Sequence, residues 1–533
     1  MPNLTWLVSA GALLASSQVF GQNAEAVSRA RMRSDLEYLA SDALEGRMTL
    51  QKGSEVAIHW IAAEFEEAGL QPLGGRTFLQ EVPLVEFRVD RERSTLAVRR
   101  GGREQIYRHG GDGFTSGFPD EVNLRAGVVF AGFGVTAPEF GYDDYKGIDA
   151  RGKVVLIFDH EPQETDPKSL FNGVGSTRHA SARSKVMNAQ KHGAVAVLLA
   201  SEPNRSHPTN SERIARVPGA QARVLRLPLQ VLANSDPRIP ILPVSDALMA
   251  DLLAESGRKA LDLQLAIDRT FKPQSMVLPG AEVQIRLATS ERRLGSTYNV
   301  IGMLEGSDPE LKAETIVYSG HFDHDGAPEG GIAHGADDNA SGTAGVIELA
   351  RAFAKAARPK RTLLFAVFAA EERGLLGSYY YTMHPLRPLR GTRAVINFDM
   401  IGRNETPSRQ TDGMIEIAKD TSNELNLVGT INSPDYRETV ESANGGVGLK
   451  LNYKWDRDAA LNIYSRSDQY PFSLHEIPAI WWFTGFHPDY HQTTDTAEKI
   501  NFEKMERIVR LAYLTGEKFA NATAPPRFVE RVR

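Results

Sequence analysis

From Pro279 onward the sequence alternates short apolar runs with polar loops and helix-like stretches, and this pattern most constrains the fold. Strand-like runs that are apolar throughout and separated by helices are typical of parallel sheets buried on both faces. The runs are ETIVYSG, TLLFAVFA, RAVINFDM and IPAIWWFTG, and the helix-like stretch is GTAGVIELARAFAKAA. The sequence therefore predicts an α/β fold with a mostly parallel central sheet flanked by helices. Ligands bind at the carboxyl ends of strands in such sheets.

Residues of the metal-ligand type follow these runs and one loop between them. A single His or Asp after a strand is usually a loop or capping residue. Here five segments carry them: His321, Asp323 and His324; Asp337 and Asp338; Glu371 and Glu372; Asp399; and His487, Asp489 and His491. Five such segments at strand or helix ends make coincidence a weak explanation.

Glu371 and Glu372 stand side by side directly after a buried run. Alone, such a pair most often opens a solvated loop. A metal site gives the two carboxylates different uses, because one can bind an ion while the other stays unbound as a general base.

The chain of 533 residues has no cysteine, which excludes disulfides, thiolate ligands and a cysteine nucleophile. A metal site must therefore use His, Asp and Glu, a donor set that suits zinc in a catalytic role, and two ions can share a bridging carboxylate roughly 3.5 to 4 Å apart. The net charge of −6 gives no sign of a nucleic-acid-binding face.

The N-terminal part of the chain predicts export and a second module. The apolar run from Leu4 to Ala15 is too short for a membrane span, and with Val19 and Gly21 placed for cleavage it predicts a signal peptide over 1–21. No other segment predicts a membrane span. Residues 28–70 predict two surface helices, and the stretch from Arg125 to Ala200 predicts a small, separate α/β module.

The motifs GHFDH, GADDNASG, AAEERGLLGS, NFDMIGR and YHQTTDT, in this order, resemble those of the co-catalytic zinc aminopeptidases of metallopeptidase family 28. This group includes bacterial leucine aminopeptidases and glutamate carboxypeptidase. The resemblance implies a zinc-peptidase (phosphorylase/hydrolase-like) fold with a smaller inserted α/β protease-associated domain. It divides the chain into an N-terminal peptidase part (22–120), the insert (121–278) and the catalytic domain (279–533).

The resemblance also assigns roles to residues. It implies two zinc ions, with Asp337 as the carboxylate that bridges them and Asp338 joined to it by a cis peptide bond. One ion takes His321 and Asp399, and the other takes Glu372 and His491. Glu371 matches the general base, and Asp323 matches a residue that holds the imidazole of His321.

The chain departs from the family pattern at Gln469, where many relatives with such an insert have histidine in a Ser-Asp-His sequence. That histidine is not a metal ligand in the pattern, so the zinc pair is unaffected. The change concerns substrate contact or hydrogen bonding near the pocket, because an amide cannot change its charge near neutral pH.

These observations predict an exported, periplasmic or extracellular, metallo-aminopeptidase that hydrolyses N-terminal residues from peptides. The implied mechanism uses a water bridging the two zinc ions, whose proton Glu371 accepts. A carboxypeptidase or dipeptidase of the same fold is the main alternative, with Arg373, Arg403 and Arg466 as candidates to hold a terminal carboxylate. A one-zinc glutaminyl cyclase and a non-catalytic receptor-like binding protein are further alternatives.

Overall fold

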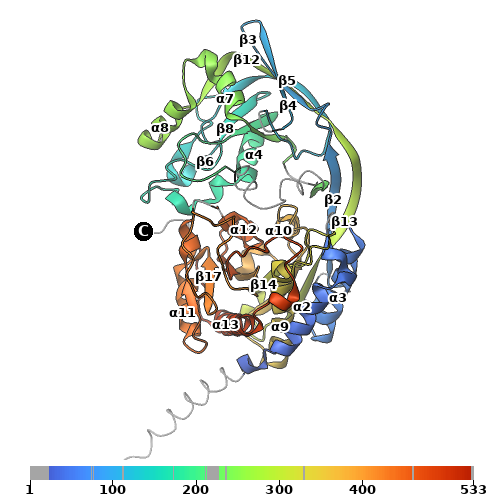
Figure 1. Ribbon diagram of the computed structural model, residues 1–533. Helices are drawn as coiled ribbons and strands as arrows, with labels where there is room; N and C mark the ends of the chain where they lie inside the picture. The colour runs from blue at the N-terminus through green and yellow to red at the C-terminus, as the bar shows by residue number, and fades with distance from the viewer. Residues whose placement is uncertain are drawn as a thin grey trace, which may run out of the picture. The chain divides into compact units, whose positions relative to one another are not determined.

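The computed structural model describes residues 23–529, except 74, 76, 111–112, 172, 210–211, 213–226, 235–236, 328–330, 459–460 and 462. The predicted signal peptide over 1–21 lies outside the described residues. The described chain divides into two compact units (Figure 1). The first unit comprises residues 23–82, 296–456 and 466–529, and the second comprises 83–295 and 457–465.

A mixed sheet forms the centre of the first unit, in the order β13-β15-β14-β16-β19-β17-β18. Its strands are β13 (Thr289–Leu304), β14 (Thr315–His321), β15 (Thr362–Phe368), β16 (Thr392–Phe398), β17 (Glu424–Val428), β18 (Lys450–Asn452) and β19 (Ala479–Phe483). The inner strands β15, β14, β16 and β19 run parallel, whereas β13 and β17 pair antiparallel with their inner neighbours. The predicted α/β fold with a parallel sheet centre is confirmed.

Helices cover both faces of this sheet. They are α2 (Arg29–Leu39), α3 (Lys52–Glu67), α9 (Gly342–Lys355), α10 (Leu376–Met383), α11 (Pro434–Asn444), α12 (Gln469–Ser473) and α13 (Phe502–Asn521). Side chains of β14 alternate between two cores, because successive residues of a strand point to opposite faces. Ile316 and Tyr318 pack in the core that contains α2, α3, α9 and α13, while Val317 packs in the core with Tyr381 of α10 and Phe472 of α12. The four apolar runs are therefore strands buried on both faces, as their sequences indicate.

The second unit contains its own sheet, in the order β11-β9-β8-β5-β12-β3-β4. The strands are β3 (Thr95–Arg100), β4 (Arg103–Arg108), β5 (Val122–Phe130), β8 (Val154–Phe158), β9 (Ala196–Ala200), β11 (Ile241–Val244) and β12 (Met276–Leu287). Strands β5, β8, β9 and β11 are parallel, and α4 (Ala182–Lys191) joins β8 to β9 in the chain. Helices α7 (Asp246–Leu253) and α8 (Ala260–Thr270) contribute Leu248 and Ile267 to the core.

The second unit is longer than the segment 121–278 that the family resemblance assigns to the insert. The reason is strand pairing, since β12 pairs with both β5 and β3, and β3 pairs with β4. Strand β2 (Leu79–Val89) pairs with β10 (Leu229–Leu232). Two strands, β2 and β13, contain residues of both units, because the chain passes from one unit to the other within them.

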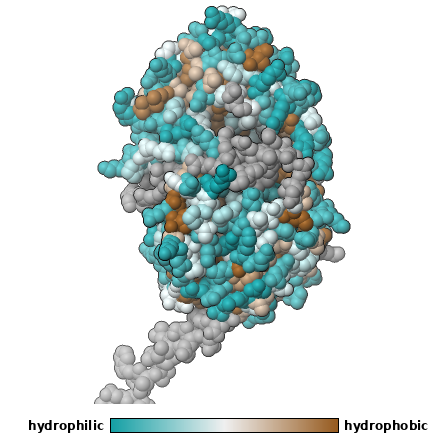
Figure 2. All heavy atoms as spheres, in the orientation of Figure 1, coloured by the Kyte–Doolittle hydropathy of each residue, from teal (hydrophilic) through white to brown (hydrophobic). Residues whose placement is uncertain are grey.

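Hydrophilic residues predominate on the face drawn in Figure 2, and the hydrophobic ones are scattered among them. This distribution agrees with the burial of the strands and of the inner helix faces in the cores described above. Among the described helices, none is both long enough and apolar enough to cross a membrane.

Candidate metal centre and active site

The parallel strands bring their carboxyl ends together, and the predicted ligands lie at that edge. His321 is the last residue of β14, Asp399 directly follows β16, and Glu371 and Glu372 follow β15. His491 lies in the loop after β19, and Asp338 lies in the short π-helical turn Ala336–Ser341 that leads into α9. Sheet topology thus explains why residues so far apart in the sequence meet.

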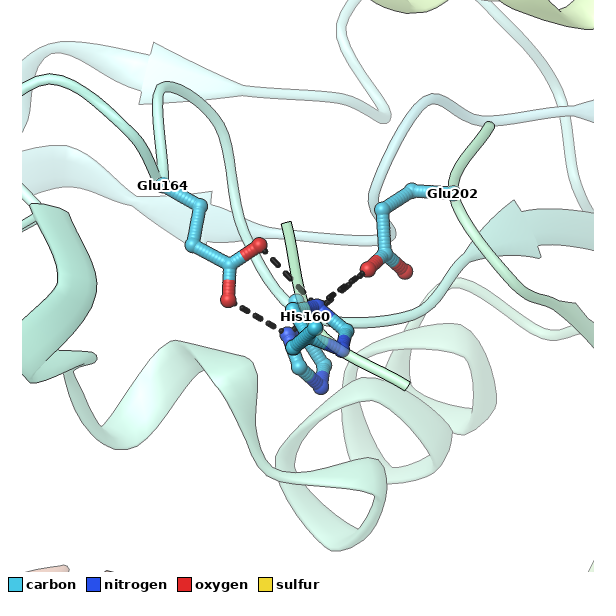
Figure 3. Close-up of side chains that lie close together, drawn as sticks. His160, Glu164 and Glu202 are labelled. Carbon is cyan, nitrogen blue, oxygen red and sulfur yellow. Dashed lines mark hydrogen bonds and ion pairs between the residues drawn. The ribbon is translucent and has the colours of Figure 1, made fainter. Parts of the chain in front are cut away.

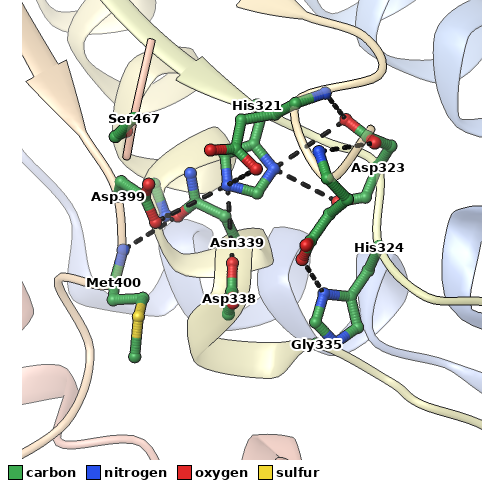
Figure 4. A network of polar contacts seen from close by, with 12 residues as sticks. His321, Asp323, His324, Gly335, Asp338, Asn339, Asp399, Met400 and Ser467 are labelled. Atoms are coloured by element: carbon green, nitrogen blue, oxygen red, sulfur yellow. Dashed lines mark hydrogen bonds and ion pairs between the residues drawn. The ribbon is translucent and has the colours of Figure 1, made fainter. Parts of the chain in front are cut away.

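Three groups of three side chains at this edge could each hold a metal ion: His321, Asp338 and Asp399; Asp338, Glu372 and His491; and His324, Asp325 and Glu372. The first two, which share Asp338, are called the His321 triad and the His491 triad. In the His321 triad, Nε2 of His321 lies 3.4 Å from Oδ1 of Asp338 and 3.5 Å from Oδ1 of Asp399 (Figure 4). In the His491 triad, Nε2 of His491 lies 3.2 Å from Oδ2 of Asp338 and 3.5 Å from Oε2 of Glu372. The two oxygens of one carboxylate, Asp338, therefore face the two triads.

This arrangement corrects the prediction that Asp337 is the shared carboxylate. Oδ1 of Asp337 accepts a hydrogen bond from the backbone N–H of Gly402 at 2.6 Å, and its Oδ2 lies 3.2 Å from Nε2 of His487. The side chain of Asp337 therefore points away from both triads. The cis peptide bond joins Asp338 to Asn339, not Asp337 to Asp338. Asp495, which was not predicted from the sequence, accepts hydrogen bonds from the backbone N–H groups of Asp337 and Asp338.

Asp323, the residue predicted to hold the imidazole of His321, contacts that ring through its backbone. Its carbonyl oxygen lies 3.2 Å from Nδ1 of His321, whereas its carboxylate is 3.9 Å away. The carboxylate instead accepts the backbone N–H of Glu371 at 3.0 Å and the hydroxyl of Thr49 at 3.2 Å. Asp323 thus orients both the imidazole and the loop that carries the two glutamates.

Two residues of the HFDHDG stretch have positions that the sequence reading did not assign. Nδ1 of His324 lies 2.8 Å from Oε1 of Glu372, and Oδ2 of Asp325 lies 2.9 Å from Nδ1 of His491. Ligating histidines almost always give their second ring nitrogen to an acceptor. If His491 binds a metal, this rule predicts an acceptor for its second ring nitrogen. Asp325 could have been identified from the sequence as a candidate for that acceptor.

Glu371 lies beside the triads without belonging to either. Its Oε2 is 3.8 Å from Nε2 of His321, and the side chain is 9% exposed. Burial raises the pKa of Glu371 well above its ordinary value; the neighbouring His321 opposes this rise, and Glu372 and Asp399 add to it. Asp338 behaves differently: burial opposes its ionisation, but the imidazoles of His321 and His491 hold its pKa well below the usual range.

The donor set fits a metal of the zinc type. It consists of imidazole nitrogens and carboxylate oxygens without sulfur, and these atoms lie within 4.8 Å of one another in each triad. Nε2 of His321 is buried and has no hydrogen-bond partner within the described part of the chain. A cation between the side chains of the triad would satisfy that atom.

Gln469 takes part in hydrogen bonding beneath the site. It is buried at the start of α12, where its Oε1 accepts from the Asn397 side chain at 3.4 Å. The same amide group of Asn397 donates to Oγ of Ser467 at 2.8 Å. Ser467 lies close to Asp399 in Figure 4, so these residues support the strand end that carries a candidate ligand.

The three arginines considered for a terminal carboxylate have different surroundings. Arg403 contacts Asp489 at 2.8 Å, and Arg466 donates to the Tyr490 hydroxyl at 3.1 Å. Arg373 lies 3.8 Å from Asp325, and its buried Nε and Nη2 have no hydrogen-bond partner among the described residues.

Two parts of the chain match known protein families. Residues 299–515 match the profile of Peptidase family M28, and residues 124–223 match that of the PA domain. The probable lipoprotein aminopeptidase LpqL of Mycobacterium tuberculosis is 27% identical over 290 residues, which cover 50% of each protein. Aminopeptidase NAALADL1 of Mus musculus is 28% identical over 285 residues, covering 45% of this chain and 37% of the mouse protein. The chain thus spans half the length, or less, of these two relatives.

A solved structure extends the likeness to the fold of nearly the whole chain. An aminopeptidase from Aneurinibacillus sp. strain AM-1 superposes with a TM-score of 0.50 at 20% identity, covering 96% of this chain and 98% of that one. The segment that matches Peptidase family M28, residues 299–515, contains Glu371 and every residue of both triads. Residues 299–515 therefore match Peptidase family M28, and they are preceded in the chain by a segment that matches the PA domain.

Proposed function

We propose that this protein is an exported metallo-aminopeptidase that uses two zinc ions to remove N-terminal residues from peptides. The single observation that carries the proposal is the Asp338 carboxylate, whose oxygens face His321 at 3.4 Å and His491 at 3.2 Å. A carboxylate shared between two ligand groups suits a pair of catalytic ions that lie close together. The aminopeptidase relatives support the same reaction class.

In this proposal His321 and Asp399 hold one ion, Glu372 and His491 hold the other, and Asp338 binds both. When bound, the ions would polarise the scissile carbonyl and lower the pKa of the attacking water. His324 and Asp325 orient Glu372 and His491 through contacts of 2.8 and 2.9 Å. Such contacts fix the ring orientation and raise ligand basicity.

Glu371 is the proposed general base. Its carboxylate lies beside the His321 triad, and its backbone is held by the Asp323 carboxylate at 3.0 Å. A carboxylate outside the ligand set can accept the proton of the attacking water and pass it to the leaving amine. Glu371 therefore moves a proton, while its neighbour Glu372 binds metal.

The test is a set of matched peptides with free or acetylated N-termini and free or amidated C-termini. An aminopeptidase should cleave those peptides of the set that have a free N-terminus. Acetylation of the N-terminus should block cleavage, and amidation of the C-terminus should not change it. A chelator should abolish the activity, and added zinc should restore it. Cleavage of the acetylated peptides would overturn the assignment.

One observation favours a carboxypeptidase as the second candidate. The buried guanidinium of Arg373 follows Glu372 in the chain and has hydrogen-bond donors without partners among the described residues. Such a group suits a terminal carboxylate. The same peptides decide, since a carboxypeptidase is blocked by amidation and not by acetylation.

A further inference from the structure

A second group of imidazole and carboxylate side chains lies in the second unit, at the carboxyl ends of β8 and β9. His160 is the second residue after β8, and Glu202 is the second residue after β9. The strands are parallel, and their last residues, Phe158 and Ala200, lie opposite each other. His160 and Glu202 therefore follow the strand ends at the same edge of the sheet. Glu164 and His207 come from the loops that follow. We call these four residues the His160 cluster; Figure 3 labels three of them.

The distances within the His160 cluster suit a single ion. Nδ1 of His160 lies 2.8 Å from Oε1 of Glu164 and 3.7 Å from Oε1 of Glu202. Nε2 of His207 lies 3.1 Å from Oε2 of Glu164 and 2.7 Å from Oε1 of Glu202. A tetrahedral site with bonds of about 2.0–2.1 Å separates its donor atoms by about 3.3 Å. One of the four observed separations is longer than that value and three are shorter, so a bound ion would move these side chains only slightly apart.

The orientation of His207 places a lone pair toward the two carboxylates. Its Nδ1 lies 3.0 Å from the carbonyl oxygen of Pro208, which can only accept a hydrogen bond. In the neutral ring, Nε2 is then unprotonated and faces oxygens of Glu164 and Glu202, which are also acceptors. Ligating histidines commonly have their other nitrogen bound to a backbone carbonyl in this way. Acceptors that converge on one point are satisfied either by a bound cation or by a proton on the imidazole.

Glu202 gives a second, independent indication. The residue is 2% exposed, and its Oε1 has no hydrogen bond of acceptable geometry within the described part of the chain. This atom points at both imidazoles (Figure 3 shows it directed toward His160). A buried carboxylate oxygen without a hydrogen-bond donor is costly unless a charge or an ion compensates it.

Charge and burial favour a divalent ion. All four side chains are buried, and the two carboxylates carry two negative charges that a divalent cation with neutral imidazoles balances. Lys185 strengthens the site's backbone, since its ammonium donates to the carbonyl oxygens of Phe133, Phe158 and His160. The site is therefore held in place by contacts outside the cluster.

We propose that His160, Glu164, Glu202 and His207 bind one zinc-type divalent ion as a closed structural site of the second unit. The nitrogen and oxygen donors, in a chain without cysteine, suit zinc or a similar transition ion. Four buried protein ligands leave no open position for a substrate, so the ion joins the loops after β8 and β9 and takes no part in hydrolysis.

The experiment compares zinc content per chain in variants that share the Asp338→Ala change, which removes metal bound between the two triads. In this background we expect about one zinc ion to remain, and the double change Glu202→Gln with His207→Gln to remove it. The matched control is His179→Gln, which removes another buried imidazole of the same unit, paired with Glu139 at 2.8 Å. The control should keep its zinc. A chelator should lower the Tm of the Asp338→Ala protein and not that of the variant lacking the cluster.

Crystals of the wild-type chain grown with zinc provide a measurement that does not depend on the folding of any variant. Anomalous diffraction at the zinc edge should give a peak between the four side chains. Equal zinc content with and without the Glu202→Gln and His207→Gln changes would overturn the proposal. The absence of an anomalous peak at the cluster would overturn it as well, and would identify the cluster as an ion-pair network of protonated histidines.

Discussion

Oδ2 of Asp325 lies 2.9 Å from Nδ1 of His491, and the opposite nitrogen of the same ring faces Asp338 at 3.2 Å. The aspartate therefore sets the direction in which His491 presents its lone pair. The same loop also supplies His324, which contacts Glu372, so two residues of one stretch orient two candidate ligands of one triad.

This relationship predicts that Asp325→Asn weakens metal binding without removing a ligand. An amide can present its nitrogen to the ring, which disfavours the required tautomer, and loss of such a partner typically costs 10–100-fold in affinity. Competition with a zinc chelator measures the change. Asp308→Asn, in an exposed turn that caps Leu311, is the control and should bind zinc like the wild type. An unchanged affinity in Asp325→Asn would contradict the orienting role.

The two neighbouring aspartates should respond differently to mutation. Asp338→Ala should release the ions of both triads and abolish activity, because its two oxygens serve both. Asp337→Ala should keep most of the metal, since its carboxylate contacts Gly402 and His487 instead. Zinc content measured by mass spectrometry separates the two. Equal loss of zinc in Asp337→Ala and Asp338→Ala would contradict the different roles proposed for the two aspartates.

Glu371→Gln should retain metal while kcat falls by about 10²- to 10⁴-fold, the usual contribution of a general base. The amide keeps the size of the side chain but cannot accept the proton. Kinetics and zinc content are measured on the same preparation. Glu372→Gln serves as the contrasting variant, because it should lose metal from the His491 triad. Turnover near the wild-type rate in Glu371→Gln would exclude the proposed role.

The contact between α13 and the sheet predicts a stability effect. A Cβ at Gly516 would lie 1.6 Å from the Tyr318 hydroxyl, so Gly516→Ala must displace a buried side chain. We expect a loss of about 1–3 kcal/mol in the free energy of unfolding, which exceeds the gain of roughly 1 kcal/mol in helix propensity. Urea denaturation measures it, with Tyr318→Phe alone as the control. The double variant that combines Gly516→Ala with Tyr318→Phe should recover part of the lost free energy of unfolding. The hydroxyl is absent from this variant, but Cζ of the ring would still lie 2.5 Å from the new Cβ.

The signal-peptide prediction concerns residues outside the described chain and is tested directly. Expression in a bacterial host should yield an exported protein whose mature N-terminus is Gln22. N-terminal sequencing of the periplasmic and cytoplasmic fractions checks this. Full-length protein retained in the cytoplasm would contradict the proposed export.

Sequence and structure agree most closely where periodicity governs the local conformation. The apolar runs correspond to β14, β15, β16 and β19, and GTAGVIELARAFAKAA corresponds to α9. Four of the five expected ligands, His321, Glu372, Asp399 and His491, lie together because parallel strands share a carboxyl edge, whereas Asp337 contacts Gly402 and His487 instead. The sequence predicted less about the second unit. His160 and Glu202 are 42 residues apart in the chain, and no sequence motif indicates that their side chains meet.

The sequence by itself determined the strand and helix pattern, the exclusion of thiolate ligands and the set of residues available for a metal centre. Only the tertiary structure decided which of Asp337 and Asp338 faces the triads, and it assigned contacts to His324, Asp325 and Asp495. The physical reason is local geometry: in an irregular turn, adjacent side chains have no fixed period and point wherever distant partners accept them. For Asp337 those partners are Gly402 and His487, and for Asp338 they are His321 and His491.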